Sequence, residues 1–109
     1  MTANYGALGK AMSIVGAVTP YTVPTSGVLF ATVSVNLVNK GTTDAKVSLS
    51  MSTKATPDPQ DYIEYQAVIP ADGGSLERTC IVMSPGENVI VEADSPLVAI
   101  RAYGMEQSA

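Results

Sequence analysis

Four acidic residues lie within the stretch TPDPQDYIEYQAVIPADGG, residues 56–74: Asp58, Asp61, Glu64 and Asp72. Two suitably spaced carboxylates can hydrolyse a glycosidic bond, and several oxygen ligands in one loop can bind Ca²⁺. Positions three apart on an extended strand face opposite sides, so Asp61 and Glu64 cannot converge within one strand. Asp58 and Asp61 can share a loop, but their spacing is not the D-x-D-x-D-G pattern of an EF-hand. We therefore expect solvated acids at a strand end, with no catalytic residue and no metal site.

Other groups that could support catalysis are scarce in this chain. The sequence has no histidine, which removes the commonest general base, the usual hydrolase triads and most zinc catalysis. The single cysteine, Cys80, lies in the apolar run TCIVM without an activating histidine, so we expect a buried structural thiol. The segments GALG and ADGG lack the strand-to-helix context and the lysine of a phosphate-binding loop. The sequence thus predicts a protein without enzymatic activity and without a cofactor.

The composition indicates one domain rich in β-structure. At 109 residues the chain has the length of a single domain, and its apolar residues are mostly Val, Ala, Leu and Ile. The net charge is −4 and the six basic residues are scattered, so nucleic acid is not an expected partner. No apolar run has the length of a membrane span, and residues 12–18 make a poor signal peptide. We therefore expect no membrane partner and no processing signal.

Short runs of alternating apolar and polar residues, separated by Gly, Pro and Asn turns, predict strands along most of the chain. In AKVSLSMS, for example, Ala45, Val47, Leu49 and Met51 share one face and the polar residues share the other. The predicted strands cover residues 21–23, 28–39, 45–52, 61–69, 75–83, 88–93 and 97–104. Their regular spacing, with no convincing amphipathic helix, predicts an all-β fold: an antiparallel β-sandwich of Greek-key or jelly-roll-like type.

Residues 1–19 do not follow this alternation. They are small, apolar and nearly uncharged, and they predict an irregular N-terminal arm ahead of a sandwich domain over residues 20–109. Val28 and Phe30 lie on the nominally outer face of the first long strand, so the outer surface is not all solvated. A contiguous exposed apolar patch marks an interface, and we expect self-association or docking on a larger assembly. The candidate interface residues are Tyr5, Met12, Ile14, Val15, Val28, Phe30, Tyr62 and Tyr103.

The two tyrosines of the predicted strand 61–69 are expected on opposite faces. Tyr65 is in phase with Ile63 and Ile69, so we expect it in the core, whereas Tyr62 shares the solvent face with Glu64. Exposed aromatic side chains serve sugar stacking as well as protein interfaces. A carbohydrate-binding or receptor-binding module, with Ca²⁺ near the acids of the opening stretch, therefore stays open as an alternative.

Several short motifs occur here in a characteristic order: YTVP, the N-x-G turn in VNKG, DYIEY, I-P-A-x-G followed by LERT, S-x-G-E, and the closing R-x-Y-G-x-E. In this order, over about residues 19–107, the sequence resembles a family of small β-sandwich virion proteins of tailed bacteriophages. Members of that family are decoration (cement) or fibre-type structural components. The resemblance implies a non-enzymatic structural role and offers no catalytic residues to carry over.

A free-standing small domain suits a capsid surface protein better than a long fibre. The resemblance therefore implies a capsid decoration or cement protein, made in the host cytoplasm and located on the virion. Its expected partners are itself, as a homo-oligomer such as a trimer, and other virion proteins such as the major capsid protein. The alternative within the same family is a tail, baseplate, neck or fibre component.

Overall fold

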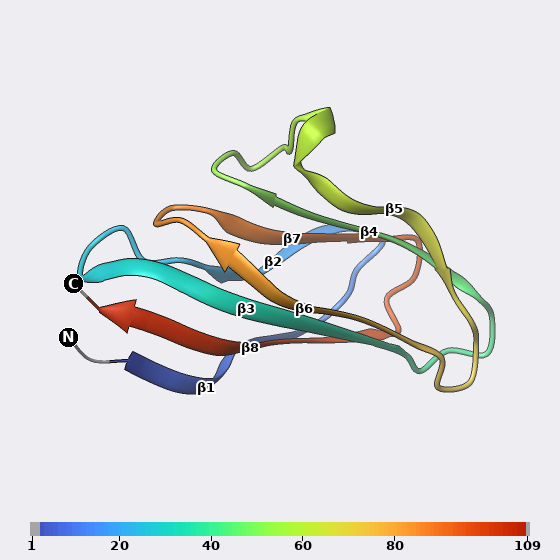
Figure 1. Cartoon of the computed structure of the whole chain (residues 1–109). Coiled ribbons are helices and arrows are strands. Elements are labelled where there is room, and N and C mark those ends of the chain that lie inside the picture. The colour runs from blue at the N-terminus through green and yellow to red at the C-terminus, as the bar shows by residue number, and fades with distance from the viewer. Residues whose placement is uncertain (1–2, 109) are drawn as a thin grey trace.

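A computed structural model describes residues 3–108, and these form eight strands in two four-stranded antiparallel sheets (Figure 1). The strands are β1 (Ala3–Met12), β2 (Gly16–Thr22), β3 (Val28–Asn39), β4 (Ala45–Ser52), β5 (Tyr62–Ile69), β6 (Ser75–Met83), β7 (Asn88–Ala93) and β8 (Val98–Ser108). A single 3-10 turn, η1 (Pro59–Asp61), precedes β5. The predicted all-β sandwich is confirmed.

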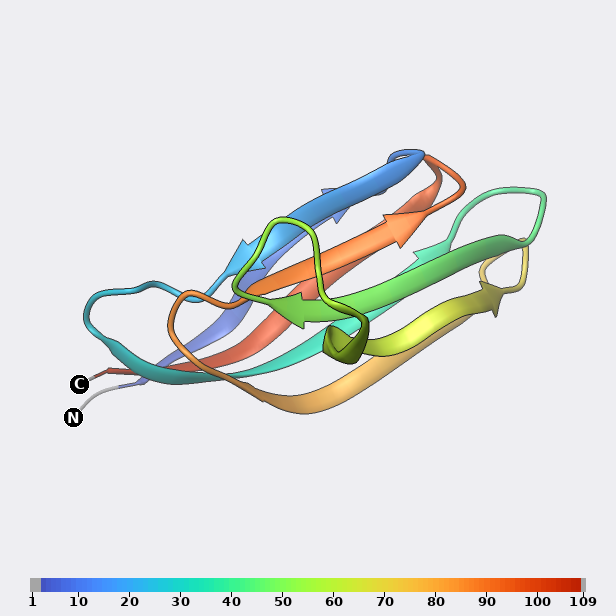
Figure 2. The same ribbon diagram turned by 90° about the horizontal axis from the view of Figure 1, so that it is seen from above.

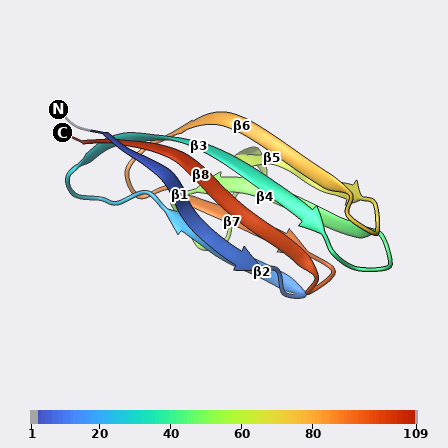
Figure 3. The same cartoon turned by 90° about the horizontal axis from the view of Figure 1, so that it is seen from below.

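The strands pair in a nested order. Sheet A has the order β1-β8-β3-β6 and sheet B the order β2-β7-β4-β5. Strands β4 and β5 pair with each other, then β3 with β6, β2 with β7 and β1 with β8, so the chain is wound as a folded-over hairpin. This nested pairing is that of a jelly-roll-like sandwich. The two layers are seen from above in Figure 2, and sheet A lies nearest the viewer in Figure 3.

The core lies between the two sheets because alternate residues of each strand point inward. Along β3, Val33, Val35 and Leu37 are fully buried, and along β4, Val47 and Leu49 face them. The outward positions between them are mostly polar, as the sequence predicts for a strand with one buried side. A one-residue slip of either strand would expose its whole apolar set, so the register is strongly specified.

The structure corrects the expected irregular arm over residues 1–19. Strand β1 pairs along nearly the whole of β8, and β2 pairs with β7; residues 1–2 lie outside the described part of the chain. Close packing of the two sheets requires a glycine at position 9, since a Cβ atom there would overlap the carbonyl oxygen of Pro20 on the other sheet. Alternation is weak here because β1 lies at the edge of sheet A and is half exposed.

Bulges in β5 and β6 correct two further predictions. Gln66 and Cys80 have φ angles of 50° and 57°, and the strand register shifts beside each. An extra residue reverses the alternation on one side of the bulge, so side chains that the pattern places inward turn outward. Tyr65, predicted in the core, is 67% exposed, and Cys80, predicted as a buried thiol, is exposed.

Candidate functional site

The outer face of sheet A, here called the sheet A face, presents apolar side chains on all four strands. Because the strand register is fixed, Tyr5, Met105, Thr32 and Val82 stand directly opposite one another and form one row across the sheet. Tyr5 is 77% exposed and Val82 is 70% exposed. Three apolar side chains, with one threonine among them, thus cross the whole sheet, and an exposed patch of this kind is typical of a surface that a partner covers.

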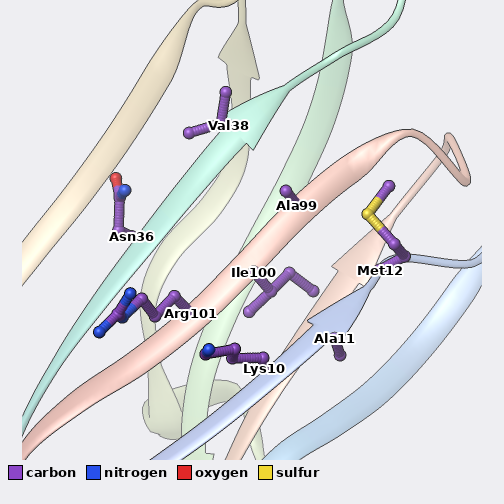
Figure 4. A pocket seen from close by; sticks show the side chains of 8 residues that line it. All are labelled: Lys10, Ala11, Met12, Asn36, Val38, Ala99, Ile100 and Arg101. Carbon is purple, nitrogen blue, oxygen red and sulfur yellow. The ribbon is translucent and has the colours of Figure 1, made fainter. Parts of the chain in front are cut away.

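A hollow of about 480 Å³ lies at the other end of the same face (Figure 4). Met12 on β1 stands opposite Ala99 on β8, which stands opposite Val38 on β3, and these three form its apolar part. The next row holds Lys10 and Arg101, whose side chains extend side by side in Figure 4. The hollow therefore combines an apolar floor with two cations.

The two cations are paired unfavourably. Lys10 and Arg101 are direct cross-strand partners, and like charges in such positions destabilise a sheet. Neither forms an ion pair with any other residue in 3–108, although the chain as a whole carries a net charge of −4. A carboxylate placed over this row would relieve the repulsion and be attracted by both charges.

Tyr103 is held flat across the middle of the sheet A face. It lies on β8, and its hydroxyl donates a hydrogen bond of 2.7 Å to Oε2 of Glu77 on β6, two strands away. This hydrogen bond, followed by partial desolvation, raises the pKa of the Tyr103 hydroxyl. The ring must therefore lie over β3, where Ser34 is its cross-strand partner. The aromatic surface is thereby fixed before any partner arrives.

The structure brings together part of the predicted interface. Tyr5, Met12, Phe30 and Tyr103 come from the outward positions of β1, β3 and β8 and share the sheet A face. Ile14 and Val15, in the connection after β1, are 49% and 72% exposed. The other two lie elsewhere: Val28 packs against the core, next to a register shift in β3, and Tyr62 belongs to sheet B. The interface role of all eight residues stays a prediction.

Residues that the sequence argument missed also contribute to this face. Val82 and Met105 complete the apolar row, and Lys10 with Arg101 form the cationic one. Most of the strands that carry them could be predicted from the sequence. Which residues stand opposite each other, however, depends on the register between strands that are more than 20 residues apart in the chain. No local sequence pattern encodes that register. The only signal in the sequence for this site was the positive charge of Lys10 and Arg101.

The acids of residues 56–74 serve local structure. The Asp61 carboxylate accepts a hydrogen bond of 2.8 Å from the backbone N–H of Asp58 and so closes η1. Asp58 lies 3.0 Å from Lys54, and Glu64 lies 2.7 Å from Arg78. Within residues 3–108 no group of three or more acidic or cysteine side chains could hold a metal ion, and no helix is long and apolar enough to cross a membrane.

The fold and this surface together define a small two-layer β-sandwich with apolar side chains exposed on the outer face of sheet A. No family model and no curated protein matches the chain. Two solved structures of a pentameric capsid protein isolated from metagenomic phage sequences are similar in fold. The first is 11% identical with a TM-score of 0.44 over 94% of this chain and 62% of that chain. The second is 12% identical with a TM-score of 0.42 and covers 94% of this chain and 60% of that chain. The chain thus spans about 60% of their length.

Proposed function

We propose that the protein is a non-enzymatic structural component of a bacteriophage virion, and that it decorates or cements the capsid through the sheet A face. The observation that carries the proposal is the row of Tyr5, Met105, Thr32 and Val82, apolar except for Thr32, which crosses the whole sheet. Soluble monomers rarely expose a large apolar patch. The resemblance of the sequence to small virion proteins of tailed phages supports the same assignment.

The size of the face fits this role. Four strands about 4.8 Å apart, each about ten residues long at about 3.3 Å per residue, give an area on the order of 600 Å². A stable interface of standard size buries about 800 Å² on each partner. The sheet A face alone thus offers about three quarters of that area. Binding through this face would resist separation of the capsid subunits that it bridges.

The partners that we propose are a second copy of this chain, in a cyclic oligomer such as a trimer, and the major capsid protein. Lys10 and Arg101 favour a partner that carries a carboxylate opposite the hollow. The location that we propose is the capsid surface. A tail, baseplate or neck location uses the same face, and imaging of labelled particles distinguishes the two: label on the tail alone rejects the capsid assignment.

The test places a charge in the apolar row. Val82→Glu puts a carboxylate at a 70% exposed position of the sheet A face, and Val68→Glu is the matched control at a 55% exposed position of sheet B. We expect Val82→Glu to lose co-sedimentation with virions and to sediment as a smaller species, whereas Val68→Glu behaves as the parent. Equal behaviour of the two variants, with both folded by circular dichroism, would reject the sheet A face as the docking surface.

A further inference from the structure

A second hollow, of about 400 Å³, lies at sheet B and is lined by Pro57, Pro59, Tyr62 and Tyr65. The prolines come from the connection between β4 and β5, which lies over the outer side of sheet B in Figure 2, and the tyrosines come from β5. We propose that this hollow binds the ring of a neutral saccharide. Its volume is in the range of small-ligand sites, and its lining is apolar and rigid.

The aromatic pair is built in a way that leaves one ring free. The two ring centroids are 5.2 Å apart and the planes meet at 80°. The Tyr62 hydroxyl donates a hydrogen bond of 2.9 Å to Glu92 on β7, two strands away, so its ring lies across β4 and covers Ser50. Tyr65 stands against this fixed ring and is 67% exposed. The C–H groups of a sugar ring pack well on the electron-rich face of such an aromatic ring.

The exposure of Tyr65 depends on a strained backbone. The bulge beside it places Gln66 at a φ of 50°, a conformation that non-glycine residues adopt rarely. Without the bulge, Tyr65 would share the inward phase of Ile69. Bulges commonly re-aim a side chain at a functional site, and this bulge turns the Tyr65 ring outward into the hollow.

The polar groups beside the hollow select a neutral ligand rich in hydroxyl groups. Asp58, between the two prolines, pairs with Lys54 at 3.0 Å, whereas Glu64 faces away from the hollow, since its cross-strand partner is the buried Leu49 and it pairs with Arg78 of sheet A. The Lys54–Asp58 pair is balanced in charge, so the rim does not favour a charged ligand. It also offers carboxylate acceptors and an ammonium donor, which suit the hydroxyl groups of a sugar.

A proline-rich peptide is the other ligand that an aromatic and proline-lined surface could take. Such a peptide offers mainly backbone carbonyl groups and so needs hydrogen-bond donors from the site. The Tyr62 hydroxyl donates to Glu92 instead, and of the Lys54–Asp58 pair a peptide carbonyl could use the ammonium alone, whereas a sugar hydroxyl can also use the carboxylate. The observations therefore favour the saccharide. The proposal is independent of the docking role, because this hollow lies on sheet B and the docking row lies on sheet A.

The experiment titrates the full chain with glucose, galactose, N-acetylglucosamine and the β-1,4-linked tetramers of glucose and N-acetylglucosamine. The chain has five tyrosines and no tryptophan, so tyrosine fluorescence reports on the site, and calorimetry measures affinity. We expect at least one saccharide to bind with a Kd of about 1 mM or below. Tyr65→Ala should weaken that binding at least about tenfold. Tyr65→Phe, which keeps the ring, should stay within about twofold of the parent.

Tyr5→Ala is the matched control, because it removes an exposed tyrosine (77%, against 67% for Tyr65) from the sheet A face and should leave saccharide binding unchanged. Thermal unfolding of each variant separates lost binding from lost folding. The absence of binding to every saccharide at 50 mM (about fifty times the expected Kd) would overturn the proposal. So would binding of a decaproline peptide that requires Tyr65 while no saccharide binds, or saccharide binding that survives Tyr65→Ala.

Discussion

Ser48 and Ser50 are two residues apart on β4, both buried on the outer side of sheet B, and they differ in their hydrogen bonding. The Ser48 hydroxyl accepts a hydrogen bond of 2.9 Å from the backbone N–H of Gln66 in the bulge. The Ser50 hydroxyl has no hydrogen-bond partner among the described protein atoms. We expect Ser48→Ala to destabilise the protein and Ser50→Ala to stabilise it. The two variants share one strand, one face and one change of side chain.

The magnitudes follow from the two hydroxyl environments. A donor left without an acceptor costs about 1–3 kcal/mol, and we take about 1 kcal/mol because the Gln66 backbone is partly reached by water. Removing an unpaired buried hydroxyl gains about 1 kcal/mol, at the lower end of the cost of burying it. The strand propensity of serine and alanine cancels between the variants. Their free energies of unfolding should therefore differ by about 2 kcal/mol.

Urea unfolding followed by circular dichroism measures this difference. With an m value of about 1.5 kcal/mol per M, the two midpoints should lie about 1.3 M apart, with the parent between them. All three proteins must be compared at one concentration and one oligomeric state, because association adds to stability. A Ser50→Ala variant less stable than the parent by more than about 0.5 kcal/mol would refute the argument, since its hydroxyl would then make a net favourable hydrogen bond.

Three other predictions rest on single residues. Burial raises the pKa of Tyr21 above 10.0, and the hydrogen bond to Glu106 and the charge of Glu106 raise it further. The contribution of the Tyr21 hydroxyl to stability is therefore complete below pH 10 and is lost as the pH rises further. Tyr21→Phe should flatten the fall in urea midpoint between pH 9 and 11. The exposed Cys80 should react with a thiol reagent without denaturant, whereas a buried thiol would react only on unfolding. Gly104→Ala, which puts a Cβ atom onto the carbonyl oxygen of Thr32 at a φ of 142°, should cost more than about 2 kcal/mol in urea unfolding.

Local alternation was enough to predict most strands. Strands β4, β6 and β7 have the predicted bounds, because a turn segment with Pro, Gly or Asp follows each of them. Strand β8 continues to Ser108, four residues beyond its prediction, because it pairs with β1 on one side and β3 on the other. Those partners are distant in the chain, so nothing local to residues 105–108 shows that they extend the strand.

The candidate sites were harder to predict than the strands. The sheet A face needs the register of four strands, and the saccharide hollow needs a bulge that reverses the alternation at Tyr65. Sequence alternation assumes an unbroken period of two, so a single extra residue makes it assign the wrong face. Cys80 was misplaced for the same reason. The errors thus fall at the residues where the strands depart from regular geometry.

These departures share one position in the fold, the edges of the sheets. The edge strands are β1 and β6 in sheet A and β2 and β5 in sheet B, and the register of each shifts against its neighbour. At Gln66 and Cys80 the backbone N–H bonds instead to a serine hydroxyl, Ser48 or Ser34, on the adjacent inner strand. An edge interrupted in this way is a poor template for pairing with another sheet. Association through strand edges is therefore disfavoured, and the surfaces left for binding are the two outer faces: the apolar rows of sheet A and the aromatic hollow of sheet B.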